Sequence, residues 1–115
     1  MPKRKLSFAC DLKDNSALIK EYKNYHTQEG IWPEITKSLM DAGIVDMQIY
    51  LTGNRLFMTM EVDEEFSLER KARMDTENQK VQDWEELMWK YQQAIPWAKP
   101  GEKWVRMEEI FSLNG

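Results

Sequence analysis

The chain is poor in the residues that build metal centres and covalent cross-links. It holds one cysteine, Cys10, and one histidine, His26. A lone cysteine cannot form a disulfide within the chain, which fits a reducing compartment. No HExxH, CxxC or EF-hand spacing is present, so we expect no metal site. Gly53 and Gly101 stand apart from other glycines, so we also expect no glycine-rich phosphate-binding loop.

Long apolar runs and concentrated positive charge are also missing. No run approaches the roughly 20 residues of a membrane-spanning helix, and a strand-like segment follows the basic residues 1–5 in place of an apolar signal core. We therefore expect a protein that does not span a membrane and that is located in the cytoplasm. The 16 basic residues are scattered among 20 acidic ones, with a net charge of −4. Because nucleic-acid binders concentrate positive charge on one face, we do not expect DNA or RNA as a partner.

What is present is the composition of a folded chain. Hydrophobic residues make up 42% and charged residues 31%, as in globular proteins. The length predicts one domain over residues 1–115.

The first part of the chain predicts a strand and two helices. Residues 5–12 alternate as a strand, so Cys10 would be a buried structural thiol on its apolar face. Asp14 or Asn15 would begin a helix that runs toward His26 and is ended by Gly30. Pro33 suits the first turn of a second helix, and Gly43 the residue after its end.

The remainder predicts a hairpin, two more helices and a last strand. The expected strands are 44–51 and 55–62, the helices 64–75 and 79–93, and the final strand 104–113.

The resulting order is a β-α-β-β-α-β plan in which each crossover holds two helices. It predicts an α+β protein with a ferredoxin-like antiparallel sheet. Helices would cover one face of that sheet. Methionine, tryptophan and phenylalanine are too abundant for both faces to be hidden in a chain this short, so we expect a homodimer formed through the free face.

His26 is the candidate for proton transfer near neutral pH. Tyr22 stands four positions earlier, so both side chains would project from neighbouring turns of one helix face. Histidine titrates near pH 6.5 and can donate or accept a proton, and a tyrosine hydroxyl can orient a substrate oxygen. The alternative is an ordinary helix-end histidine that stabilises through the helix dipole. Since no GxSxG or comparable nucleophile site is present either, catalysis would be cofactor-free isomerisation, tautomerisation or mutarotation.

The tryptophans are each best explained by core or interface packing. Trp84 and Trp89 stand five positions apart, which is about 140° around a helix. They cannot both point straight into one core, so one of them is a candidate for lining a cavity.

Several segments together resemble the L-rhamnose mutarotase family, from the first strand to the region of Phe111. They are Glu21-Tyr22-x-x-x-His26, Ile31-Trp32-Pro33-Glu34, Ile49-Tyr50-Leu51, and Met88-Trp89-Lys90-Tyr91 with the following Pro96. The resemblance implies a small cytoplasmic protein with the fold of a dimeric α/β-barrel. It implies interconversion of the α and β anomers of L-rhamnose without cofactor or metal. It also implies that His26 is the catalytic acid and that Tyr22 and Trp89 contact the sugar.

Three departures from the family pattern concern the sugar. Met88 replaces the first residue of an adjacent Trp-Trp pair, and Met47 stands where the family has a tyrosine. The stretch between His26 and Ile31 is also longer by two residues than is usual. Met47 and Met88 are therefore candidate sugar-binding positions, and the substrate is expected to be L-rhamnose or the related 6-deoxy sugar L-fucose.

Three functional hypotheses follow. The first is a mutarotase for a 6-deoxy-L-sugar, in which His26 protonates the ring oxygen. The second is a non-catalytic dimeric module that binds a sugar or another small molecule. The third, by analogy of fold alone, is a cofactor-free oxygenase.

Overall fold

The computed structural model describes residues 4–114, and its elements follow the predicted order. They are β1 (Arg4–Leu12), α1 (Ser16–Tyr25), α2 (Pro33–Asp41), β2 (Ile44–Thr52), β3 (Arg55–Val62), α3 (Leu68–Thr76), α4 (Gln79–Trp89), β4 (Gln92–Gln93) and β5 (Val105–Arg106). Two helices precede the β2–β3 hairpin and two follow it, so the doubling of each crossover is confirmed.

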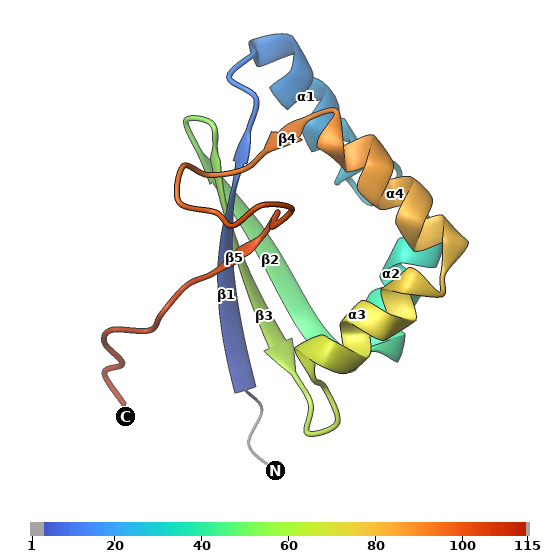
Figure 1. Cartoon of the computed structure of the whole chain (residues 1–115), viewed down its shortest axis with the longest axis vertical. Helices are drawn as coiled ribbons and strands as arrows, with labels where there is room; N and C mark the ends of the chain where they lie inside the picture. Colours follow the sequence, from blue (N-terminus) through green and yellow to red (C-terminus); the bar gives the residue numbers. More distant parts are fainter. Residues whose placement is uncertain (1–3, 115) are drawn as a thin grey trace.

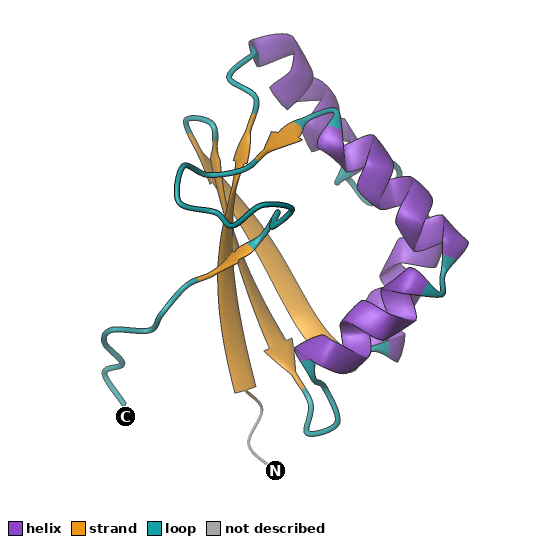
Figure 2. Ribbon diagram, viewed as in Figure 1, coloured by secondary structure: helices purple, strands orange, loops and turns teal. Residues whose placement is uncertain are grey.

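The strands form one antiparallel sheet in the order β2-β3-β1-β4, with β5 also paired to β1. This is the ferredoxin-like arrangement, and the predicted α+β class is confirmed. The four helices all lie on one side of the sheet (Figures 1 and 2). None of the helices in the described range is long and apolar enough to cross a membrane.

The last strand differs from the prediction of a continuous strand over 104–113. Two short strands, β4 and β5, share the same edge of β1: Gln92 pairs with Leu12, and Val105 pairs with Ala9. Residues 94–104 loop out between them. This loop includes two prolines, which cannot donate to a sheet ladder.

The chain beyond β5 leaves the sheet. The amide of Met107 still donates to the carbonyl oxygen of Ser7 at 2.8 Å, but no strand continues after it. Ile110, Phe111 and Leu113 are highly exposed. The prediction placed these apolar residues in a strand, and in the structure they follow the chain away from the body of the protein (Figure 1).

Helix α4 also ends earlier than predicted, at Trp89 and not at residue 93. The amides of Lys90 and Tyr91 bond to carbonyl oxygens only three residues back, which tightens and closes the helix. Gln92 and Gln93 then join β1 in the sheet. At the other end of the helix, the side chain of Asn78 accepts hydrogen bonds from the amides of Lys80 and Val81 in the first turn.

Glycine is required where α2 turns into β2. Gly43 has a φ of +99°, a conformation that residues with a Cβ rarely adopt. A Cβ there would lie 2.5 Å from an oxygen of Asp63. The predicted role of Gly43 at the end of the second helix is therefore confirmed, and it fixes how α2 meets the sheet.

The core lies between the sheet and the helices. In β3, which was predicted as a strand, every second side chain is buried, namely Leu56, Met58, Met60 and Val62. Cys10 is fully buried, and burial raises the pKa of its thiol to about 12. It is a structural residue, as predicted, because a thiol with this pKa forms almost no reactive thiolate near neutral pH.

Candidate functional site

A cavity of about 330 Å³ opens between the sheet and the helices. This volume falls within the usual range for sites that bind small molecules. Its wall is mostly apolar and receives side chains from all four helices, from β1, β2 and β3, and from the loop before β5. Within residues 4–114, no three histidine, cysteine, aspartate or glutamate side chains gather closely enough to hold a metal ion.

Helix α1 brings Tyr22 and His26 to this cavity. The helix begins because the side chain of Asn15 accepts hydrogen bonds from the amides of Ala17 and Leu18, at 3.0 and 3.1 Å. It ends at Tyr25, before Gly30, and His26 is its C-terminal cap. The rings of Tyr22 and His26 lie 4.2 Å apart and both line the cavity, so the predicted shared face is confirmed.

One ring nitrogen of His26 is committed to the backbone. Its Nδ1 lies 2.8 Å from the carbonyl oxygen of Tyr22. Since a carbonyl oxygen can only accept, we assign the proton to Nδ1, which leaves Nε2 as the nitrogen available for exchange. Burial lowers the pKa of His26 below 6.5, and the bond to Tyr22 opposes this only in part. The resting histidine is therefore neutral at pH 7, with a basic Nε2.

The ring of Trp84, from helix α4, packs against the ring of His26. Its ring meets those of His26, Tyr25 and Trp32 in edge-on contacts, with centroid distances of 5.6, 6.1 and 5.2 Å. Such packing fixes the ring of His26 in one orientation. Trp84 itself lines the cavity, and it is the one of the Trp84 and Trp89 pair that does so.

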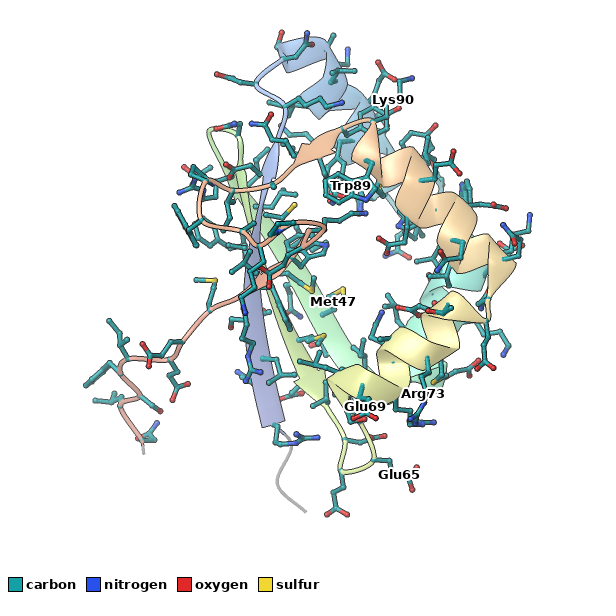
Figure 3. The ribbon with its side chains drawn as sticks, viewed as in Figure 1. Met47, Glu65, Glu69, Arg73, Trp89 and Lys90 are labelled. Carbon is teal, nitrogen blue, oxygen red and sulfur yellow. The ribbon has the colours of Figure 1, made fainter. Side chains whose placement is uncertain are left out.

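Trp89 does not lie among the residues that line the cavity. It sits at the end of α4, near β4 (Figure 3), and is 39% exposed. The ammonium of Lys103, which does line the cavity, lies 4.8 Å from the centre of its ring. The sugar contact that the family resemblance implies for Trp89 stays a prediction, whereas Trp84 and Trp104 offer indole surfaces to the cavity.

Both methionines singled out in the sequence line the cavity. Met47 extends from β2 on the side of the sheet that faces the helices (Figure 3), and Met88 projects from α4 and is 2% exposed. Methionine is unbranched and flexible. The structure thus brings together four of the five predicted site residues, and the contribution of these two to sugar binding stays a prediction.

Five polar residues of the wall were not predicted, and three of them, Glu85, Gln92 and Lys103, make side-chain contacts that shape the site. The amide of Gln92 donates to the hydroxyl of Tyr22 at 3.1 Å. The ammonium of Lys103 lies 2.6 Å from a carboxylate oxygen of Glu85, and all three residues line the cavity. A signal for Glu85 exists in the sequence, because it stands within the apolar stripe of α4 formed by Val81, Trp84 and Met88.

Comparisons with known proteins agree with this architecture. A sequence model of the L-rhamnose mutarotase family matches residues 5–113. An L-fucose mutarotase from Xanthomonas campestris pv. campestris is 40% identical over 114 residues, which are 99% of this chain and 91% of the relative. A protein of Dictyostelium discoideum is 36% identical over 110 residues, covering 92% and 86% of the two chains.

A solved structure shows the same fold. The crystal structure of an L-rhamnose mutarotase from Formosa agariphila superposes with a TM-score of 0.70 at 24% identity, and the match covers 96% of this chain and 98% of that one. The predicted resemblance is thereby confirmed. The chain belongs to the L-rhamnose mutarotase family, whose members are isomerases that act on sugars.

Proposed function

We propose that this protein is an aldose mutarotase of one domain, residues 1–115, that interconverts the α and β anomers of a 6-deoxy-L-sugar without a cofactor. The observation that carries the proposal is the neutral His26, with one free ring nitrogen, in a mostly apolar cavity of small-molecule size. The 40% identity to an L-fucose mutarotase favours L-fucose over L-rhamnose as the substrate.

The reaction requires one proton to move between two oxygens of the same carbon. In the ring form, the anomeric O1–H must lose its proton and the ring oxygen O5 must gain one. The C1–O5 bond then breaks as the C1=O1 double bond forms. The open aldehyde turns about its C1–C2 bond, and O5 attacks the other face of C1 while the proton returns to O1.

His26 is suited to carry this proton on Nε2. Resemblance alone implied an acid, but a lowered pKa makes the accepting form the resting one. In this proposal Nε2 therefore first takes the proton of O1 and, as the imidazolium, gives it to O5. Because Nδ1 carries a proton in both states, its bond to the carbonyl oxygen of Tyr22 also favours the cation in this proposal. General acid–base catalysis of this kind contributes about 10²- to 10⁴-fold in rate.

The surrounding residues would orient the sugar. The hydroxyl of Tyr22 accepts from Gln92 and so keeps its own proton for a sugar oxygen. Burial raises the pKa of this hydroxyl, which keeps it protonated. Trp84 and Trp104 present flat apolar surfaces to the C–H face of the ring, with Met47 and Met88 beside them. Trp89 supports this wall through Lys103.

We also propose that the protein is a cytoplasmic homodimer. The helices leave one face of the sheet uncovered (Figure 2). On that face Tyr50, which is 58% exposed, pairs with Phe57 of the neighbouring strand, and Phe57 pairs with Ala9. This apolar row suits a second copy of the chain. A single buried cysteine suits a reducing compartment.

The test is anomer exchange measured by saturation-transfer NMR on L-fucose and L-rhamnose, with D-glucose as a control sugar. We expect the wild type to accelerate exchange of one of the 6-deoxy sugars and His26→Gln to lose about 10²- to 10⁴-fold of that acceleration. If the wild type accelerates neither, or if His26→Gln matches it, the proposal fails. Binding of a sugar without exchange would support the non-catalytic module instead.

A further inference from the structure

Glu85 is an acid in a wall that is otherwise apolar, neutral or basic. Among the described residues that line the cavity, it is the one carboxylate. It projects from the same face of α4 as Trp84 and Met88, and its side chain is 46% exposed. Its position in the otherwise apolar stripe of α4 places this half-exposed carboxylate at the cavity wall, where a ligand can reach it.

Lys103 holds this carboxylate in place. Its ammonium donates to Oε2 of Glu85 at 2.6 Å and to the backbone carbonyl oxygen of the same residue at 3.3 Å. The ring of Trp89 lies on a further side, 4.8 Å away. The side chain of Lys103 is only 9% exposed. A lysine fixed on three sides has little freedom to reach a ligand, and we infer that it positions its partner.

The other oxygen of Glu85 remains open. Within residues 4–114, no hydrogen bond is made to its Oε1. An ionised carboxylate accepts on both oxygens, with about four lone-pair sites. The ion pair therefore presents to the cavity a rigid, charged acceptor that lacks a donor. Polar groups held in advance in this way bind ligands without a further ordering cost.

Hydroxyl groups are the donors that a sugar brings. Two other polar side chains of the wall are engaged, Lys71 with Asp75 at 2.5 Å and Ser38 with the carbonyl oxygen of Ile35 at 2.8 Å. Among the described residues, the neutral Oε1 of Gln92 is buried without a partner, so Glu85 is the charged acceptor of the wall. His26 keeps Nε2 for the moving proton. We propose that Glu85, positioned by Lys103, accepts a hydrogen bond from a ring hydroxyl of the sugar and thereby determines which sugar the site selects. This inference rests on the proposed function and deepens it.

The experiment compares Glu85→Ala and Glu85→Gln with Glu86→Gln, which removes a neighbouring exposed carboxylate of the same helix. Binding of L-fucose, and of analogues that lack one ring hydroxyl, is measured by calorimetry or ligand-observed NMR, separately from exchange. We expect the wild type to bind one of the analogues about tenfold to hundredfold more weakly than L-fucose. Glu85→Ala should bind L-fucose and that analogue alike, and Glu86→Gln should keep the wild-type preference.

Exchange kinetics distinguish recognition from proton transfer. Loss of a hydroxyl contact in Glu85→Ala should raise KM and leave the shape of the pH profile unchanged. Glu85→Gln should recover part of the affinity, and Lys103→Met should lose part of it. The inference is wrong if Glu85→Ala keeps the wild-type preference, or if it lowers kcat at unchanged KM. If the wild type binds the sugar but does not accelerate anomer exchange, the proposed mutarotase function is wrong. The role of Glu85 in binding is still tested by the affinities of the variants.

Discussion

His26 and Tyr22 are joined twice within one turn of helix α1. Their rings lie 4.2 Å apart, and Nδ1 of the histidine lies 2.8 Å from the carbonyl oxygen of the tyrosine. The first contact sets the position of the imidazole, and the second decides which nitrogen carries the resting proton. A single helical turn therefore prepares Nε2 for exchange, and Trp84 of α4 packs against the same imidazole ring.

Anomer exchange should decline on the acidic side. The folded pKa of His26 lies below 6.5, so the neutral form persists until the pH falls through that lower value. We expect exchange to fall with an apparent pKa below 6.5, measured by saturation-transfer NMR from about pH 4 to 8. An acid limb centred above 6.5 would contradict the assignment, and His26→Gln provides the baseline without this titration.

Stability should depend on the same group. Above about pH 6.5, neither the folded nor the unfolded chain protonates this histidine. As the pH falls below that value, the unfolded chain binds the proton first, so the free energy of unfolding decreases until the folded pKa is passed. Denaturant titrations of the wild type and His26→Gln should differ in this window, with the variant losing that component of the decline.

Tyr22→Phe should weaken both binding and stability. The hydroxyl accepts a hydrogen bond from the buried amide of Gln92, and its removal leaves that donor unpaired, at a cost of about 1–3 kcal/mol. Adding Gln92→Leu should restore most of the stability, because both partners are then absent. Affinity for the sugar should stay reduced in the double variant. Equal stability of Tyr22→Phe and the wild type in denaturant unfolding would contradict the contact.

The two methionines of the wall should control the choice of sugar. Met47→Tyr and Met88→Trp restore the aromatic residues of the family pattern at positions that line the cavity. We expect them, separately and together, to raise the ratio of L-rhamnose to L-fucose exchange. Met40→Tyr is the control, since Met40 is 63% exposed and outside the cavity wall. If the ratio is unchanged in both variants, Met47 and Met88 do not determine which sugar the protein prefers.

Tyr50→Glu should convert the proposed dimer into monomers. It places a charge in the apolar row on the uncovered face of the sheet. Light scattering coupled to size-exclusion chromatography should report twice the 13.7 kDa chain mass for the wild type and the single mass for the variant. Ala72→Glu, exposed on α3, should remain dimeric. A monomeric wild type would rule the dimer out.

Local patterns were sufficient for most of the fold. The sequence pattern revealed β1 and the β2–β3 hairpin, and in β3 every second side chain is buried, whereas the last five residues of β1 are all buried. The end of α4 was missed for a physical reason. Gln92 and Gln93 are compatible with a helix by themselves, but they pair with Leu12 and Asp11 of β1. Pairing with a strand near the other end of the chain cannot be predicted from the residues next to Gln92 and Gln93.

The site divides in the same way. Tyr22 and His26 were recognisable because their spacing along one helix places them together. The contacts of Gln92 with Tyr22 and of Lys103 with Glu85 span 70 and 18 positions, and nothing in the sequence around them indicates a partner. The direction of each tryptophan on α4 also depends on how the helix sits on the sheet, which its own spacing does not specify.

The split fourth strand has a consequence for how such proteins diverge. β4 and β5 each complete the edge of β1, so residues 94–104 can change in length without removing a backbone hydrogen bond of the sheet. Yet the end of that loop supplies Lys103 and Trp104 to the cavity. Insertions and deletions in this one segment can therefore change the sugar preference while the pairing of β4 and β5 with β1 is kept.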